Sequence, residues 1–168
     1  MSSGIFNQYA GYHNRRSIRL RGYDYSKPGY YFVTVCIHDR KQNLFGDIPV
    51  GAGSKAALIF PNDYATIVEN TWHDLPNHVN QIELDEFIIM PNHFHGIIRI
   101  CDHCSRRAGL EPAPTKGMPE IIRQFKTFSA KRINVLRQTP GQPVWQRNYY
   151  EHIIRNEKSL FFIRKYIR

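Results

Sequence analysis

The chain has no long hydrophobic run. None of its 168 residues fall in an apolar stretch of about eighteen, the length that a membrane-spanning helix requires. The first four residues, Met-Ser-Ser-Gly, carry no apolar core of a signal peptide. Cysteine is scarce and odd in number, at positions 36, 101 and 104, which argues against a disulfide framework. We therefore expect a cytoplasmic protein without membrane contact, in which the segment from Cys101 to Cys104 is a reduced loop.

Acidic residues are also few relative to basic ones. The chain has 14 Asp and Glu against 23 Lys and Arg, so its formal charge is +9. Such a balance favours a polyanionic partner, most simply a nucleic acid. The hydrophobic content of 42% is sufficient for a packed core. We expect one domain over residues 30–168, preceded by a basic and aromatic arm over residues 1–29.

The pattern of apolar residues predicts seven elements in the order strand, helix, strand, strand, helix, strand, helix. The predicted strands cover 30–37, 82–90, 93–100 and 144–150, and the helices cover about 62–77, 120–137 and the residues after Asn156. A two-residue turn at 91–92 makes the second and third strands a hairpin. The first six elements follow the ferredoxin-like βαββαβ order, an α+β fold. Helices would cover one face of an antiparallel sheet, which leaves the other face for function.

Two histidines begin the third predicted strand. Because side chains alternate along a strand, His93 and His95 point to one face and Phe94 points to the buried face. Two imidazoles held side by side can supply two ligands of a divalent-metal site. The alternative interpretation is a pair of exposed strand histidines without a ligand.

The final predicted helix carries Tyr166 beside its apolar stripe of Leu160, Ile163 and Ile167. A tyrosine there can simply mark the edge of the core, with its hydroxyl in water. A functional interpretation requires that hydroxyl to lie near a metal-bound phosphate. A free phenol, with a pKa of about 10, is a weak nucleophile, and a nearby cation that polarises the phosphate assists its attack.

The segment His93-Phe94-His95 matches the HUH metal motif, and the surrounding sequence resembles the REP-associated tyrosine transposases, which act on repetitive extragenic palindromes in bacteria. The matching segments span most of the chain and cover 15–25, 31–36, 87–96, 125–130, 144–156 and 165–168. The resemblance implies that His93 and His95 bind Mg²⁺ or Mn²⁺. It also implies that Tyr166 attacks single-stranded DNA, which leaves a 5′-phosphotyrosine and a free 3′-hydroxyl.

In this family a polar side chain one helical turn after the tyrosine completes the metal site. That position lies beyond Arg168 in the present numbering, so the third ligand is open. His152 and Glu151 are candidates within the chain. Related transposases also exchange their last helices between subunits, so a monomer and a homodimer with a tyrosine supplied in trans both remain open.

Basic and aromatic side chains indicate where DNA would lie, because arginine suits phosphates and aromatic rings stack on unpaired bases. The candidate DNA-binding residues are Arg15, Arg16, Arg19, Arg21 and Tyr23 in the arm, Arg123 and Lys126 on the second predicted helix, and Arg147 and Tyr150 in the fourth predicted strand. The expected partner is single-stranded or hairpin DNA with palindromic repeats. Charged faces and tails are also common without any ligand, so solvated surfaces are the alternative.

Two other functions stay open at this point. An open antiparallel sheet can bind single strands without catalysis, as RNA-recognition domains do. A replication-initiator or relaxase nuclease would share the same HUH motif, although the arm and residues 145–156 resemble the transposases more closely. Cleavage of an oligonucleotide, compared with simple retention, separates the binding module from the enzymes.

Overall fold

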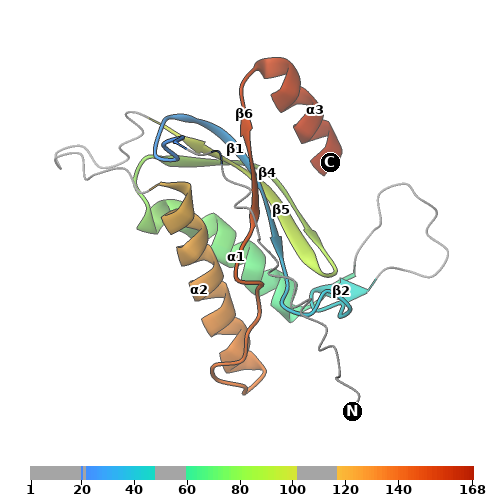
Figure 1. Cartoon of the computed structure of the whole chain (residues 1–168). Helices are drawn as coiled ribbons and strands as arrows, with labels where there is room; N and C mark the ends of the chain where they lie inside the picture. Colours follow the sequence, from blue (N-terminus) through green and yellow to red (C-terminus); the bar gives the residue numbers. More distant parts are fainter. Residues whose placement is uncertain (1–19, 21, 48–59, 102–116) are drawn as a thin grey trace, which may run out of the picture.

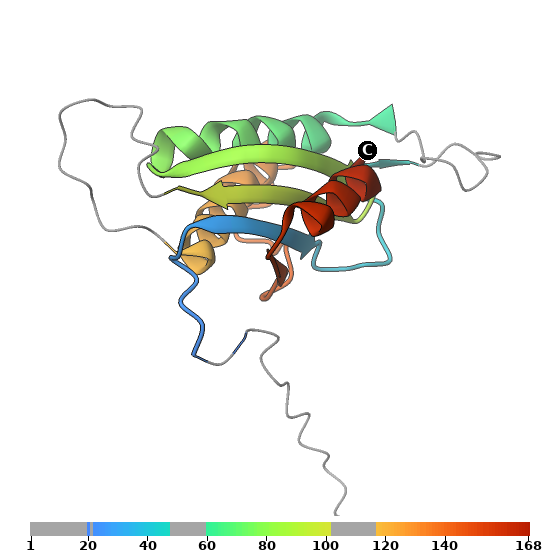
Figure 2. The same ribbon diagram turned by 90° about the horizontal axis from the view of Figure 1, so that it is seen from above.

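A computed structural model describes residues 20, 22–47, 60–101 and 117–168. Its elements are β1 (Gly29–Cys36), β2 (Gly46–Asp47), β3 (Phe60–Pro61), α1 (Asp63–His78), β4 (Ile82–Met90), β5 (His93–Ile100), α2 (Met118–Leu136), β6 (Tyr150–Ile154) and α3 (Glu157–Ile167). Four strands form one sheet in the order β4-β5-β1-β6, and each neighbouring pair is antiparallel. Helices α1 and α2 cover one face of this sheet, and α3 crosses the other face (Figures 1 and 2).

This strand order confirms the ferredoxin-like α+β fold. Strands β1 and β4 are joined through α1, strands β5 and β6 are joined through α2, and the two units interleave so that β5 and β1 are central. Right-handed crossovers of this kind place both helices on the same face. The opposite face, which we call the open face, is therefore covered only by α3 among the elements that the structure describes.

Aromatic side chains fill the core between the sheet and its two helices. The ring of Trp72 on α1 lies 4.7 Å from that of Phe94 and 5.6 Å from that of Phe125 on α2, centroid to centroid. All three residues are fully buried. Phe94 therefore points away from the open face, as strand alternation predicts, and anchors the centre of β5.

Asparagine side chains cap the starts of two helices. The Asn62 side chain accepts hydrogen bonds from the backbone N–H groups of Tyr64 and Ala65, and that of Asn156 accepts one from Ser159. These contacts satisfy donors that a helix start leaves unpaired. Helix α1 runs through Pro76 to His78, one residue past its predicted end, although proline removes one hydrogen bond of its last turn.

The predicted strand over 144–150 is wrong in position. The fourth strand of the sheet, β6, covers Tyr150–Ile154, and Trp145 contributes only an isolated bridge to Ile37. The Trp145 side chain is buried against α2, where its indole N–H donates to the hydroxyl of Ser129 over 2.9 Å. The apolar character around Trp145 therefore reflects this packing rather than strand pairing.

Two smaller features of the structure differ from the sequence predictions. The short β2–β3 ribbon lies outside the seven predicted elements. Cys101 is disulfide-bonded, so the expectation of a reduced thiol is wrong at that position.

Arg15, Arg16, Arg19 and Arg21 of the predicted arm lie outside the described residues. Tyr25 already packs in the core, although the boundary between arm and domain stays a prediction. Within the described part of the chain, no helix is long and apolar enough to cross a membrane.

Candidate active site

Helix α3 packs on the open face through a small second core. Leu160 and Ile167 are buried against Ile97 of β5 and Ile154 of β6. Residues seven apart lie on the same side of an α-helix, so this pair sets which side faces the sheet. Tyr166 consequently lies at the flank of the contact, with 68% of its surface exposed.

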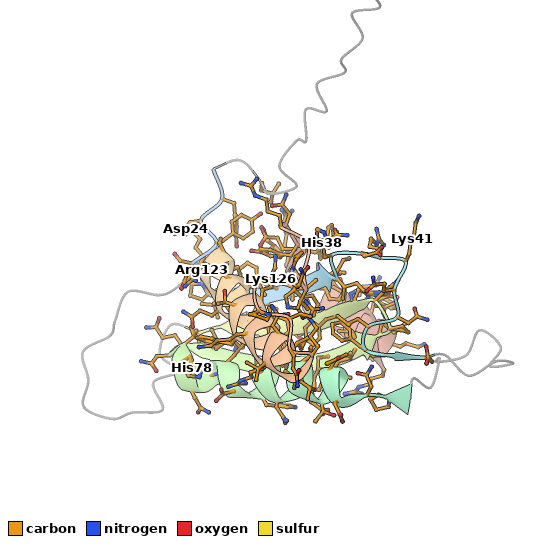
Figure 3. All side chains as sticks on the ribbon, turned by 90° about the horizontal axis from the view of Figure 1, so that it is seen from below. Asp24, His38, Lys41, His78, Arg123 and Lys126 are labelled. Atoms are coloured by element: carbon orange, nitrogen blue, oxygen red, sulfur yellow. The ribbon has the colours of Figure 1, made fainter. Side chains whose placement is uncertain are left out.

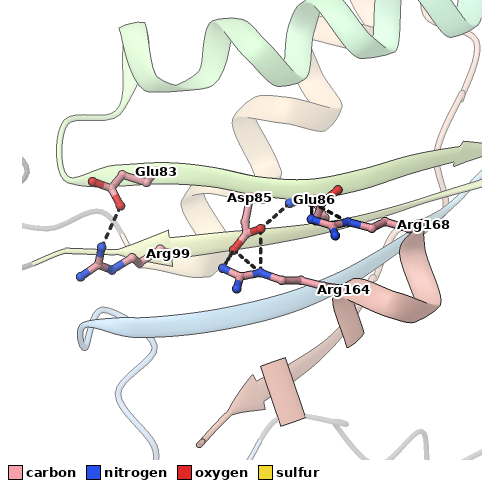
Figure 4. Close-up of polar contacts among 6 residues, drawn as sticks. All are labelled: Glu83, Asp85, Glu86, Arg99, Arg164 and Arg168. Carbon is pink, nitrogen blue, oxygen red and sulfur yellow. Dashed lines mark hydrogen bonds and ion pairs between the residues drawn. The ribbon is translucent and has the colours of Figure 1, made fainter. Parts of the chain in front are cut away.

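Two ion pairs hold α3 against strand β4 (Figure 4). The Arg164 guanidinium donates to both carboxylate oxygens of Asp85, with its Nη2 2.5 Å from Oδ2, and Arg168 pairs with Glu86. Burial raises the pKa of Asp85, but the Arg164 hydrogen bonds, the Glu86 backbone N–H and the charges of Arg164 and Arg168 together outweigh this effect and lower the pKa overall. Asp85 lies within the irregular register between Leu84 and Phe87, which directs consecutive acidic residues toward the helix.

The two histidines of β5 converge at the end of α3. The Nε2 atoms of His93 and His95 lie 3.1 Å apart, and their rings are nearly perpendicular at 80°. His95 is buried, whereas His93 is partly exposed. The prediction that both side chains share one face is thus confirmed, and their Nε2 atoms point at a common position.

The amide of Asn92 determines which nitrogen of His93 carries the proton. The Asn92 Nδ2 group donates to the backbone carbonyl of Arg40 over 2.9 Å, so its Oδ1 is the atom 2.7 Å from His93 Nδ1. Because an amide oxygen only accepts, Nδ1 of His93 is the donor. Neutral His93 therefore presents an unprotonated Nε2, the form that a metal ion binds.

His95 has a second partner on the neighbouring strand. Thr34 lies directly opposite His95 in the β1–β5 register, and its hydroxyl oxygen is 2.8 Å from His95 Nδ1. Burial lowers the pKa of His95 to about 4, with a further contribution from the charge of His93. The pKa of His93 is also lowered, by burial and by the charge of Arg40. Both imidazoles are thus neutral at pH 7.

Tyr166 approaches this pair from α3. Its hydroxyl oxygen lies 3.5 Å from His95 Nε2, and the two rings are 5.6 Å apart. Phe32 of β1 stacks on His95 at 5.3 Å and meets the Tyr166 ring edge-on at 6.4 Å. The structure therefore brings together the three residues that the sequence singles out for chemistry, from segments 71 positions apart.

A divalent cation fits the donor set of His93 and His95. Their Nε2 atoms converge, and each Nδ1 has a hydrogen-bond partner that suits a metal-binding tautomer. No group of three metal-ligating side chains occurs among the described residues. Glu151 is buried and accepts from the Tyr149 hydroxyl, and His152 lies two strands away from His95. Neither residue joins the pair.

The candidate DNA-binding residues separate between the two faces. Arg123 and Lys126 lie on α2 (Figure 3), which covers the face of the sheet opposite the open face, and a hollow of about 290 Å³ beside them also reaches Arg147. Arg123 pairs with Glu120, and the Lys126 ammonium donates to the carbonyls of Gln146 and Arg147.

The two candidate tyrosines also differ in their surroundings. Tyr23 packs on Tyr25, with its hydroxyl 3.3 Å from that of Tyr31 in the core. Tyr150 lies on the open face, directly opposite Thr34 on the edge strand. It is therefore the described DNA-binding candidate that lies nearest, by sheet register, to the histidine pair.

Sequence reasoning missed the residues that support the histidines. Thr34 lies in a strong strand pattern and Asn92 in a turn, where each residue type is ordinary. The roles of these two residues become visible only in the structure. The sheet register places Thr34 opposite His95, and the turn places the Asn92 amide beside the Arg40 carbonyl. The sequence signal that could have identified a supporting residue is its position next to the histidine motif. This signal identifies Asn92 but not Thr34.

Comparisons with known proteins show what this chain is similar to. No family model matches the chain. A Haemophilus influenzae strain Rd protein of uncharacterized function is 39% identical over 173 residues, which cover 95% of this chain and 89% of that protein. A second protein of the same strain, provisionally named a REP-associated tyrosine transposase, is 26% identical over 141 residues, which cover 82% of this chain and 66% of that protein.

Two solved structures share the fold. A REP-associated tyrosine transposase bound to a REP hairpin has a TM-score of 0.60 and 19% identity, over 89% of this chain and 69% of the other. A provisionally assigned transposase from Deinococcus radiodurans R1 has a TM-score of 0.51 and 17% identity, over 89% and 94%.

The fold is therefore one that solved transposases share, and the resemblance to the REP-associated tyrosine transposases is confirmed. The chain belongs to the same family as the uncharacterized Haemophilus influenzae protein.

Proposed function

We propose that this protein is a single-stranded DNA endonuclease and strand-transferase that cleaves and rejoins DNA carrying palindromic repeats. The observation that carries the proposal is the position of the Tyr166 hydroxyl, 3.5 Å from Nε2 of His95 and beside the converging imidazoles. A tyrosine that only closed a core edge would not need its hydroxyl directed at the buried His95. Similarity to a transposase bound to a REP hairpin supports hairpin DNA as the partner.

In the proposed reaction the Tyr166 oxygen attacks the phosphorus of a phosphodiester. A bond forms between that oxygen and the 5′-phosphate, the P–O3′ bond breaks, the phenol loses its proton, and the departing 3′-oxygen gains one. Attack by another 3′-hydroxyl reverses these bond changes and joins two strands. The ester is kept throughout, so no nucleotide cofactor is required.

The residues around Tyr166 position the reacting groups. His93 and His95 would hold Mg²⁺ or Mn²⁺ through their Nε2 atoms, and a bound cation supplies Lewis acidity toward a phosphate oxygen. Asn92 and Thr34 keep the ring nitrogens oriented, and the Arg164–Asp85 pair fixes the helix that carries the phenol. Arg40, whose charge acts on His93, provides a nearby cation for the phosphodiester.

The test is formation of a covalent adduct. A labelled hairpin oligonucleotide with single-stranded flanks is incubated with Mn²⁺ and resolved on a denaturing gel. We expect an adduct with the unchanged protein and none with Tyr166→Phe, which should still bind DNA. An adduct that persists in Tyr166→Phe refutes Tyr166 as the nucleophile.

The metal part of the proposal needs its own measurement. His93→Ala and His95→Ala should each lose cleavage and also lose Mn²⁺ binding measured by calorimetry without DNA. Retained Mn²⁺ affinity in both variants would show that the cation binds elsewhere. DNA that is bound by the unchanged protein but never cleaved or joined would instead favour a non-catalytic binding module.

A further inference from the structure

A groove runs along the outer edge of β6, beside the proposed active site. It encloses about 370 Å³, and its lining includes Tyr25, Tyr150, Glu151, His152, Arg155 and Asn156. Strand β6 is the last in the sheet order, so its outer edge is unpaired among the described strands. An unpaired edge of this kind is open to a ligand.

The sheet register connects this groove to the histidines. Tyr150 lies opposite Thr34, which lies opposite His95, so these three residues form one row across β6, β1 and β5. Two strand spacings amount to about 10 Å. In the next row His152 lies opposite Phe32, the ring that stacks on His95. A strand of DNA that reaches Tyr166 therefore passes close to the groove.

The polar side chains of the groove differ in their partners, since Asn156 caps α3 and Glu151 accepts a hydrogen bond from the Tyr149 hydroxyl. Across the described residues, the side chains of Arg99, Arg123, Arg132, Arg137, Arg164 and Arg168 all form hydrogen bonds or ion pairs. Arg155 forms none with the part of the chain that the structure describes, and the same is true of the His152 imidazole and the Tyr150 hydroxyl. Tyr150 also leaves 49% of its surface exposed.

These features match one class of ligand. A half-exposed tyrosine ring offers a surface on which an unpaired base can stack, and an unpaired guanidinium suits a phosphate. An imidazole between them can donate or accept a hydrogen bond at a base edge. An acidic peptide would pair with Arg155 but would not use the Tyr150 ring. An apolar segment would leave Arg155 and His152 without partners.

We propose that the β6 groove binds one unpaired nucleotide of the strand that Tyr166 cleaves, with its base on Tyr150 and its phosphate on Arg155. This inference rests on the proposed function for the identity of the strand. It adds a site that selects a single-stranded flank, because a base that is paired in a duplex cannot stack on Tyr150.

The experiment measures binding separately from cleavage, in the Tyr166→Phe variant of the full chain. Fluorescence anisotropy with a labelled hairpin carrying a single-stranded flank gives the affinity. We expect Tyr150→Ala to weaken binding about five- to tenfold and Tyr150→Phe to retain it. Replacing the flank bases one at a time by abasic sites should remove the Tyr150→Ala effect at one position only. Phe161→Ala, which removes another exposed aromatic ring from α3, is the matched control and should have a smaller effect.

Each outcome decides the proposal. Equal affinity of the Tyr150→Ala and Tyr150→Phe variants for every oligonucleotide overturns it, as does a loss that persists unchanged on a fully abasic flank. If Tyr150 has a position-specific effect but the protein with Tyr166 intact forms no covalent adduct, the groove proposal stands and the proposed enzymatic activity is overturned. Arg155→Ala should reduce the salt dependence of binding, since one phosphate contact is removed, whereas an unchanged salt slope contradicts the role of Arg155.

Discussion

The Thr34 hydroxyl oxygen lies 2.8 Å from His95 Nδ1, across the two central strands of the sheet. A hydroxyl can either donate or accept, so Thr34 is compatible with both neutral forms of the ring. When it accepts from Nδ1, the His95 Nε2 lone pair points at the same position as that of His93. Metal binding requires this form, and Thr34 supplies the acceptor that stabilises it.

The first prediction concerns Thr34. Thr34→Val removes the acceptor while keeping the side-chain shape, and we expect Mn²⁺ affinity to fall by about tenfold. Thr34→Ser keeps the hydroxyl and should stay close to the unchanged protein. Calorimetric titration with Mn²⁺ in the absence of DNA measures the effect. Similar affinities for the Val and Ser variants would show that the hydroxyl does not orient His95.

The second prediction concerns acid stability. The pKa of folded His95 is about 4, against about 6.5 for an ordinary histidine, so the unfolded chain binds more protons between these values. Stability is therefore retained above pH 6.5 and falls as the pH drops toward 4, by on the order of 3 kcal/mol from this residue. His93 contributes in the same direction. Urea unfolding at pH 7 and pH 5 tests this, and His95→Gln should flatten the dependence. An equal decline in His95→Gln would assign the effect to other groups.

The third prediction concerns Gly96, which follows His95 on β5. A Cβ atom at this position would lie 2.7 Å from two ring carbons of Trp72 and 2.8 Å from a Phe94 carbon. The surrounding rings are buried and cannot retreat, so Gly96→Ala should destabilise the fold by about 1–3 kcal/mol. Urea unfolding measures the loss. Gly117→Ala, where the nearest atom is 3.4 Å away, is the matched control and should cost less.

The fourth prediction concerns the docking of α3. Arg164→Met removes the pair with Asp85 and should lower the yield of covalent adduct, because Tyr166 lies on the same helix. A double-mutant cycle with Asp85→Asn should give a coupling free energy of about 1 kcal/mol, since Arg164 is partly exposed.

Arg99→Met is the control for Arg164→Met. Arg99 pairs with Glu83 over 3.0 Å on the same sheet, and like Arg164 it lies over the Tyr30 ring, but it is not part of α3 (Figure 4). It should leave the adduct yield nearly unchanged. Equal losses in the two variants would show that the Asp85 pair does not position Tyr166.

The sequence by itself determined most of the main elements and the direction of the histidines. Strands over 82–90 and 93–100 match β4 and β5 residue for residue, since their alternation and the Pro91-Asn92 turn are local signals. The shared face of His93 and His95 follows from the two-residue period of a strand, whatever the strand pairs with. Capping by Asn62 and Asn156 is equally local, because each cap contacts residues two or three positions away.

Only the tertiary structure decided where those elements meet. The sequence pattern places the fourth strand around Trp145, because a buried loop and a strand can have the same apolar pattern. Pairing with β1 decides that residues 150–154 form the strand instead. The approach of Tyr166 to His95 depends on Leu160 and Ile167 packing on the open face and on the Asp85–Arg164 pair, which joins residues 79 positions apart. Contacts between residues so far apart in the sequence leave no periodic pattern in it. They stabilise the site only when the sheet register brings the two partners together.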